Sequence, residues 1–107
     1  MQGSLSGLLE QQAYKSFYMH GSGHWLGLDV HDVGAYVEHG QPIQLAPSMV
    51  LTVEPGLYFS PTLTNIDDKW RGIGVRIEDD ILVTQEDAYV FSHRLPKEIS
   101  DLNSIGV

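Results

Sequence analysis

The chain has 107 residues, a hydrophobic content of 42% and a formal net charge of −8 at pH 7. This length suits one small domain with a packed core, and the acidic balance disfavours nucleic acids and anionic membranes as partners. Cysteine is absent and no apolar run approaches the roughly 20 residues of a membrane span, so we expect a cytoplasmic protein whose metal sites, if any, use nitrogen and oxygen ligands.

The only convincing helical spacing lies at the start of the chain. Between residues 4 and 14 the apolar side chains follow an approximately helical period, and Ser4 or Ser6 would cap the first turn. Residues 17–19, Phe-Tyr-Met, then predict a short strand that leads into a glycine-rich segment.

That segment, residues 20–32, holds three of the five histidines. Imidazole binds metals and transfers protons near neutral pH, while glycine lets the backbone approach a neighbour closely. His20 and His24 would share a face of an extended segment, whereas His31 needs a bulge or bend to join them. The alternative is a glycine-rich strand pair whose histidines are merely hydrogen-bonded.

The rest of the chain reads as strands separated by loops. The predicted elements are a loop at 34–47, strands at 49–53 and 57–59, a loop at 60–70, a long alternating strand at 72–84, a short strand at 89–91 and a short helix at 96–102. The chain is therefore predicted to be α+β. Its sheet needs a covering layer, which one early helix supplies poorly.

Two glutamates stand in or at the end of predicted strands. Glu54 follows an apolar strand and precedes Pro-Gly, and a buried carboxylate there needs a metal, a cation or hydrogen-bond donors. An exposed glutamate at a strand end is the alternative. Arg76 and Glu78 are two residues apart and project from one face, and such a pair on its own is expected to be a surface ion pair.

A histidine nitrogen and two carboxylates nevertheless form a suitable donor set for a divalent cation. Manganese, iron, cobalt and zinc all accept such ligands. A metal site of this kind lowers the pKa of bound water and polarises a carbonyl group, which predicts metal-assisted hydrolysis.

Three separated motifs resemble the proline-specific aminopeptidases of the pita-bread metallopeptidase family. They are HGSGHWLGLDVHDVG at 20–34, MVLTVEPGLYF at 49–59 and RGIGVRIEDDILVT at 71–84. The motif sequences are most similar to those of aminopeptidase P, which removes an N-terminal residue that precedes proline. Prolidase, the related Xaa-Pro dipeptidase, is the alternative. The resemblance implies an α+β chain that forms the C-terminal half of a pita-bread (creatinase/aminopeptidase) fold, with a mostly antiparallel sheet and one or two helices.

The same resemblance implies a metal-ligand set. His24, Glu54 and Glu78 match the family's metal ligands, and Glu54 would also move the proton of the attacking water. Family members typically hold two manganese ions, although cobalt or zinc also occupies such sites.

Further residues match the family's catalytic and substrate-binding positions. His20 and His31 resemble histidines that hold the substrate and assist proton transfer. Arg76 resembles an arginine that supports the site, and Tyr58 a tyrosine that lines it. The implied substrate is a proline-containing peptide.

The family's site also requires two aspartates, which we expect to precede residue 1. Asp67, Asp68 and Asp79 cannot replace them by position. Residues 1–107 are therefore expected to be one partial domain with little or no Xaa-Pro cleaving activity by itself. Two other hypotheses are an inactive half-domain that self-associates or binds a partner through an uncovered face, and a module that binds a single metal ion.

Overall fold

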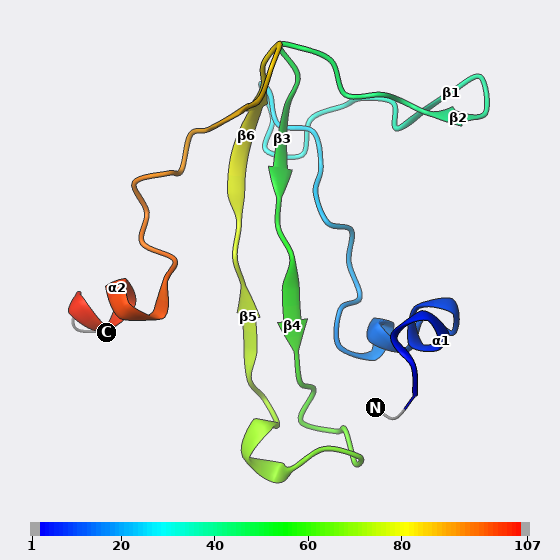
Figure 1. The fold of residues 1–107 in the computed structure, drawn as a ribbon, viewed down its shortest axis with the longest axis vertical. Helices are drawn as coiled ribbons and strands as arrows, with labels where there is room; N and C mark the ends of the chain where they lie inside the picture. The colour runs from blue at the N-terminus through cyan, green and yellow to red at the C-terminus, as the bar shows by residue number, and fades with distance from the viewer. Residues whose placement is uncertain (1–2, 106–107) are drawn as a thin grey trace. The chain divides into compact units, whose positions relative to one another are not determined.

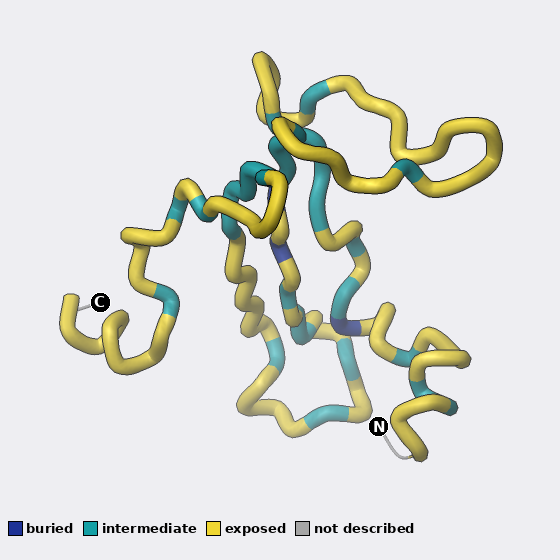
Figure 2. The backbone as a smooth tube through the Cα atoms, turned by 45° about the horizontal axis from the view of Figure 1, so that its top comes forward, coloured by how far each residue is buried: buried dark blue, intermediate teal, exposed yellow. Residues whose placement is uncertain are grey.

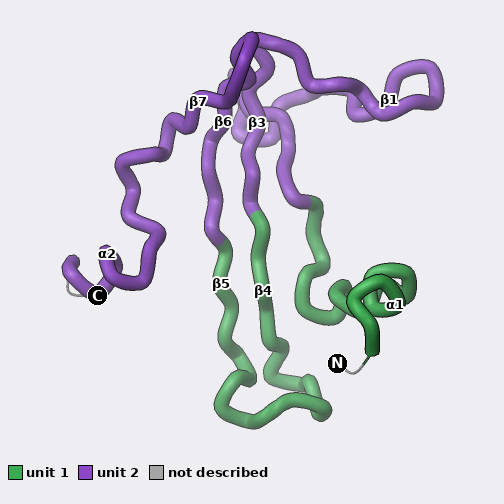
Figure 3. The backbone as a smooth tube through the Cα atoms, viewed as in Figure 1, with its two compact units in different colours: residues 1–21, 55–76 green, residues 22–54, 77–107 purple. Residues whose placement is uncertain are grey.

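The computed structural model describes residues 3–105, which form two compact units (Figure 3). Unit 1 contains residues 3–21 and 55–76, and unit 2 contains residues 22–54 and 77–105. Each unit combines a short helix with antiparallel strands, so the expected α+β class is confirmed.

Unit 1 holds a capped helix and a two-stranded sheet (Figure 1). Its elements are α1 (Leu5–Glu10), the 3₁₀ helix η1 (Ala13–Ser16), β4 (Gly56–Tyr58), the 3₁₀ helix η2 (Asp68–Trp70) and β5 (Gly74–Arg76). The Ser4 hydroxyl accepts a hydrogen bond from the Gly7 amide at 3.2 Å, which confirms Ser4 as the cap. The helix ends earlier than predicted, because a left-handed residue, Gln12, separates it from η1.

Aromatic packing organises the inner part of unit 1. Phe17 is 8% exposed, and its ring meets the ring of Phe59 edge-on with 5.5 Å between centroids. The Phe17 carbonyl accepts one hydrogen bond, at 2.8 Å, from the amide of Tyr58. The prediction of a strand at 17–19 was therefore wrong, since this stretch leaves η1 as a turn and uses its aromatic ring for packing.

Unit 2 contains most of the strands. Its elements are β1 (Val37–Glu38), β2 (Gln41–Pro42), β3 (Val50–Val53), β6 (Asp79–Val83), β7 (Ala88–Val90) and α2 (Ile99–Ser104). β3, β6 and β7 form an antiparallel sheet in that order, with Leu51 opposite Ile81 and Ile81 opposite Val90. The predicted strands at 49–53 and 89–91 and the final helix are thus confirmed, with shifted ends.

The histidine-bearing residues 22–26 lie antiparallel to β3 without forming a regular strand. Three backbone hydrogen bonds of 2.8, 2.9 and 3.1 Å join them to residues 50–54. The approach is so close that a Cβ atom on Gly23 would lie 2.0 Å from the carbonyl oxygen of Thr52. Glycine is required at this position because any side chain would collide with backbone.

Two predicted elements are organised differently in the structure. The expected loop at 34–47 contains the short hairpin of β1 and β2, and the expected strand at 72–84 is divided into β5 and β6. β5 pairs with β4, whereas β6 pairs with β3. An alternating pattern reports an extended backbone but does not reveal a change of pairing partner.

Neither helix covers a sheet of its own unit. α1 packs against η1, and α2 contacts no other element within residues 3–105. Most of the backbone is coloured as exposed in Figure 2. The exposed residues include large apolar side chains, among them Leu28, Val33 and Ile99. Neither of these helices is long and apolar enough to cross a membrane.

Candidate metal centre

One atom each from His24, Glu54 and Glu78 lies within 4.8 Å of the others in unit 2. The sheet register explains how the two carboxylates meet. Val53 of β3 pairs with Asp79 of β6, so Glu54 and Glu78 occupy the next opposed position, just beyond the ladder. The backbone pairing of residues 22–26 with β3 then brings His24 to the same place.

The ring of His24 turns an acceptor nitrogen toward Glu54. Its Nδ1 lies 2.9 Å from the carbonyl oxygen of Trp25, and since a carbonyl can only accept, Nδ1 carries the hydrogen. In the neutral ring Nε2 is then an acceptor, and it lies 3.4 Å from Oε1 of Glu54. The separation of Nε2 and Oε1 leaves room for a proton or a cation to be shared between them.

The donor set fits one divalent cation. Nitrogen and oxygen ligands bind such ions at about 2.1 Å, so two ligands of one ion lie no more than about 4.2 Å apart. The distance between His24 and Glu54 is within this range, and Glu78 is exposed and has room to adjust. Glu54 itself is 7% exposed, and burial of a carboxylate is costly unless cations or donors compensate it.

His31 lies beside this group in unit 2. A bend at residues 27–30 reverses the chain, and the Asp32 amide donates back to the Trp25 carbonyl at 3.1 Å. The bend brings the exposed ring of His31 to 4.4 Å from the ring of His24, centroid to centroid. The expected bend between these two histidines is therefore confirmed.

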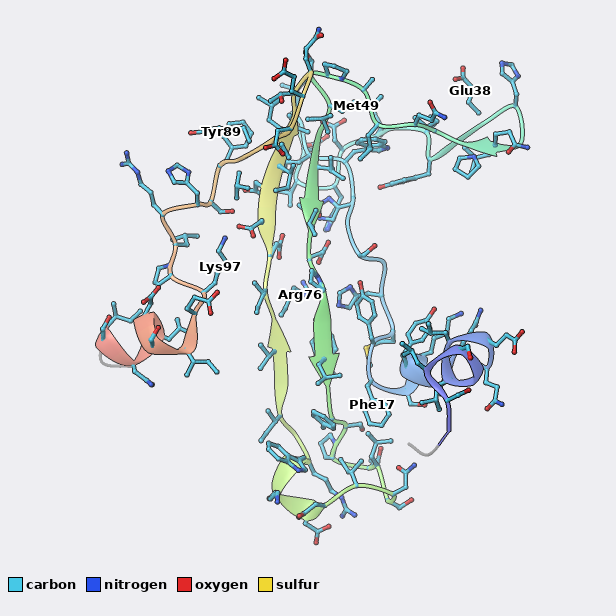
Figure 4. The ribbon with its side chains drawn as sticks, viewed as in Figure 1. Phe17, Glu38, Met49, Arg76, Tyr89 and Lys97 are labelled. Atoms are coloured by element: carbon cyan, nitrogen blue, oxygen red, sulfur yellow. The ribbon has the colours of Figure 1, made fainter. Side chains whose placement is uncertain are left out.

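The three other predicted site residues, His20, Tyr58 and Arg76, form a hydrogen-bonded chain in unit 1. Arg76 donates from Nε to the Tyr58 oxygen at 2.9 Å, and the Tyr58 hydroxyl donates to Nε2 of His20 at 2.8 Å. His20 donates from Nδ1 to the Gly21 carbonyl at 2.6 Å. The donor and acceptor roles follow because guanidinium can only donate and a carbonyl can only accept. Figure 4 labels Arg76 on β5.

Glycines make room for the Tyr58 ring. A Cβ atom on Gly56 would lie 2.4 Å from the Tyr58 oxygen, and one on Gly74 would lie 2.8 Å from Cδ1 of the same ring. Both glycines belong to the β4–β5 pair, so this small sheet is shaped around the tyrosine.

Thr52 was not among the predicted site residues, but its hydroxyl contacts both His24 and Glu54. The available signal was a lone hydroxyl in an apolar run, two residues before Glu54 and therefore on its face of the strand. Asp79, by contrast, has a structural role in unit 2. Lys97 (Figure 4) and Ser92 donate to its carboxylate and hold the pKa of Asp79 below its ordinary value.

Comparison with known protein families gives a match over residues 4–85 to the model of metallopeptidase family M24. The chain belongs to family M24. A Haemophilus influenzae Xaa-Pro aminopeptidase is 50% identical to this M24 chain over 105 residues, and an Escherichia coli Xaa-Pro aminopeptidase is 53% identical over 85 residues. These alignments cover 98% and 79% of the chain.

The M24 chain is much shorter than these relatives. It spans 24% of the Haemophilus protein and 19% of the Escherichia coli protein, and the match falls in their C-terminal part. A solved aminopeptidase structure from Pseudomonas aeruginosa superposes with a TM-score of 0.95 at 48% identity, covering 98% of this chain and 24% of that one. The expected assignment to the C-terminal portion of a pita-bread fold is thereby confirmed.

Proposed function

We propose that this M24 chain serves the hydrolysis of the peptide bond between an N-terminal residue and proline, acting in the cytoplasm. The observation that carries the proposal is the meeting of His24, Glu54 and Glu78, with Nε2 of His24 3.4 Å from Oε1 of Glu54. The relatives named as Xaa-Pro aminopeptidases, which match most of the chain, support this substrate class over a dipeptide.

His24, Glu54 and Glu78 would hold the metal, with manganese as the proposed ion. A zinc-substituted aminopeptidase P of Escherichia coli has been solved in complex with product, so zinc is a reasonable second ion to test. When bound, a divalent ion polarises a carbonyl and makes bound water a stronger nucleophile at neutral pH.

The remaining residues would handle protons and substrate. Glu54 would take a proton from the attacking water at its carboxylate and deliver it to the proline nitrogen as the C–N bond breaks. His31, exposed beside His24, would donate to the scissile carbonyl oxygen. His20, Tyr58 and Arg76, already ordered by mutual hydrogen bonds, would orient the peptide at low entropic cost.

The three ligands suit one ion rather than two, so we propose that the purified 107-residue chain forms a partial centre. Incubation of this chain with Arg-Pro-Pro and Mn²⁺ should release little or no arginine. Metal-dependent release would overturn the partial-centre proposal, whereas calorimetric binding of one Mn²⁺ per chain without release would support it. Failure to bind Mn²⁺, Co²⁺ or Zn²⁺ at all would overturn the metal centre.

A second candidate, self-association through an uncovered face, is favoured by the exposed surface. Leu28, Val33 and Ile99 are 103%, 91% and 79% exposed. Exposed apolar side chains mark interaction surfaces where they gather into one contiguous patch. Sedimentation should therefore show association that grows with concentration, and a stable monomer at high concentration would contradict this candidate.

A further inference from the structure

We propose that Thr52 is a positioning residue whose hydroxyl sets the relative placement of His24 and Glu54, and thereby the affinity of the centre for a divalent cation. The inference rests on the metal centre of the proposed function. It concerns a residue that contacts the ligands rather than one of the ligands themselves.

Thr52 is the most completely enclosed polar side chain of the described residues. It is 2% exposed, although it lies in a chain whose hydrophobic side chains are largely exposed. Hydroxyl groups are rarely buried to this degree unless they are hydrogen-bonded. The burial of Thr52 therefore makes the hydrogen-bond partners of its hydroxyl important to the local structure.

The hydroxyl makes one bond to each of two ligand residues. The amide of His24 donates to Oγ1 at 3.0 Å, so Oγ1 acts as the acceptor there. The Oγ1 hydrogen is then directed to Oε1 of Glu54 at 3.2 Å. Oε1 is also the atom that faces Nε2 of His24 at 3.4 Å, so the three residues form a closed loop around one carboxylate oxygen.

In this arrangement the hydroxyl of Thr52, rather than its backbone carbonyl, accepts the hydrogen bond from the His24 amide. In an antiparallel ladder, every second pair of opposed residues exchanges two backbone hydrogen bonds, and His24 and Thr52 occupy such a position next to the bridge between Trp25 and Leu51. The Thr52 amide does donate to the His24 carbonyl at 2.9 Å, but the return bond from the His24 amide goes to the Thr52 hydroxyl. His24 is therefore placed by a side-chain bond that a substitution can remove, while the rest of the β3 pairing remains.

Orientation of a carboxylate ligand by a second hydrogen bond has a known effect on metal affinity. Removal of such partners costs about 10-fold to 100-fold in metal binding. Loss of the Thr52 hydroxyl would affect two ligand residues together, because it releases the Glu54 carboxylate and the backbone of His24 at once.

The experiment compares the 107-residue chain with Thr52→Val, Thr52→Ser and Thr84→Val. Valine keeps the shape and removes the hydroxyl, whereas serine keeps the hydroxyl and removes the methyl group. Thr84 is the matched control, since its hydroxyl also accepts from an amide and donates to a carbonyl, both of Asp87. Mn²⁺ affinity is measured by calorimetry, the Co²⁺ complex by visible absorption and the fold by circular dichroism.

We expect Thr52→Val to weaken Mn²⁺ binding by about 10-fold or more and to alter the Co²⁺ spectrum. Thr52→Ser and Thr84→Val should remain close to the wild-type chain in both measurements. A folded Thr52→Val with unchanged affinity and spectrum would overturn the role of Thr52 and leave the metal centre standing. A wild-type chain that binds no metal would overturn the metal centre, and this inference with it.

Serine and alanine variants keep the test decisive if Thr52→Val does not fold. Thr52→Ser and Thr52→Ala differ by the hydroxyl alone, because both lack the methyl group. Tighter binding by the serine variant, again by about 10-fold, would support the inference. Equal affinities of these two variants would overturn it.

Discussion

Val53 of β3 pairs with Asp79 of β6 at the last position of their ladder. Glu54, which follows Val53, and Glu78, which precedes Asp79, therefore lie opposite each other just beyond this pair. The distance between the two carboxylates is thus set by backbone pairing rather than by side-chain packing. A centre built in this way requires that β3 and β6 stay in register, because a slip of one residue would turn one carboxylate to the opposite face.

Removal of Glu78 should weaken metal binding without unfolding the chain. The side chain is exposed, so Glu78→Ala leaves no cavity, but it removes one of three ligands. We expect the affinity for Mn²⁺ or Zn²⁺ to fall by at least about tenfold in calorimetry. Glu38→Ala, which removes an exposed glutamate of β1, is the matched control. Equal affinities in the two variants would rule out Glu78 as a ligand.

Substitution of Gly23 should displace residues 22–26 from β3. The new methyl group of Gly23→Ala would meet the Thr52 carbonyl oxygen at 2.0 Å, and backbone must move to relieve the collision. Forced shifts of this kind cost about 1–3 kcal/mol. Hydrogen exchange of the Thr52 and Glu54 amides should accelerate, because both donate to this segment. Ser22→Ala changes the neighbouring exposed residue and should leave their exchange slow.

The contact of Lys97 with Asp79 should stabilise the chain in a pH-dependent way. The hydrogen bonds from Lys97 and Ser92 lower the pKa of Asp79, so the ionised carboxylate is favoured in the folded state. This contribution is present above the unfolded-state pKa of about 3.9 and is lost as the pH falls through the lower folded-state pKa.

Urea unfolding of Lys97→Met measures this effect. Both partners are about one quarter exposed, so solvent screening limits the expected loss at pH 7 to roughly 0.5–1 kcal/mol. The difference from the wild-type chain should vanish in strong acid. Lys69→Met is the control, since its partner Asp67 is 56% exposed and the pair should contribute less. A loss that is constant down to pH 2 would contradict the assignment.

The hydroxyl of Tyr58 should determine the tautomer of His20. The wild-type ring carries its hydrogen on Nδ1, because the Tyr58 hydroxyl donates to Nε2 and the Gly21 carbonyl accepts from Nδ1. Tyr58→Phe removes that donor and should let Nε2 carry the hydrogen in part of the population, which ¹⁵N NMR resolves. We also expect a loss of about 1–2 kcal/mol in stability, because Arg76 loses its acceptor at Tyr58.

Tyr14→Phe provides the comparison for this variant. Tyr14 is an exposed tyrosine of unit 1, in η1, and its removal should change neither the tautomer of His20 nor the stability by more than a few tenths of a kcal/mol. An unchanged ¹⁵N pattern in Tyr58→Phe would show that the Gly21 carbonyl alone selects the tautomer.

Several structural features around the candidate site could be predicted from short stretches of sequence. The apolar run before Glu54 predicts β3, and Pro-Gly predicts its end, because both signals act within a few residues. The cap at Ser4 is local for the same reason. The three ligand residues were named from motif resemblance, and the structure brings them within 4.8 Å of one another.

Other features were decided by contacts between distant residues. The alternation of residues 72–84 continues through Ile77 and Glu78, but the pairing partner changes there from β4 to β3. The bond from Lys97 to Asp79 joins residues 18 positions apart. No local period carries such information, because the choice depends on which strand lies alongside.

The sequence by itself determined which residue types are available to a metal and which short segments are extended. The tertiary structure decided which nitrogen of His24 faces Glu54, and it revealed the buried hydroxyl of Thr52 between them. The directions of these side chains and the roles of donor and acceptor are fixed only when residues 22–26 pair with β3. Each polar group that this pairing buries then requires a hydrogen-bond partner.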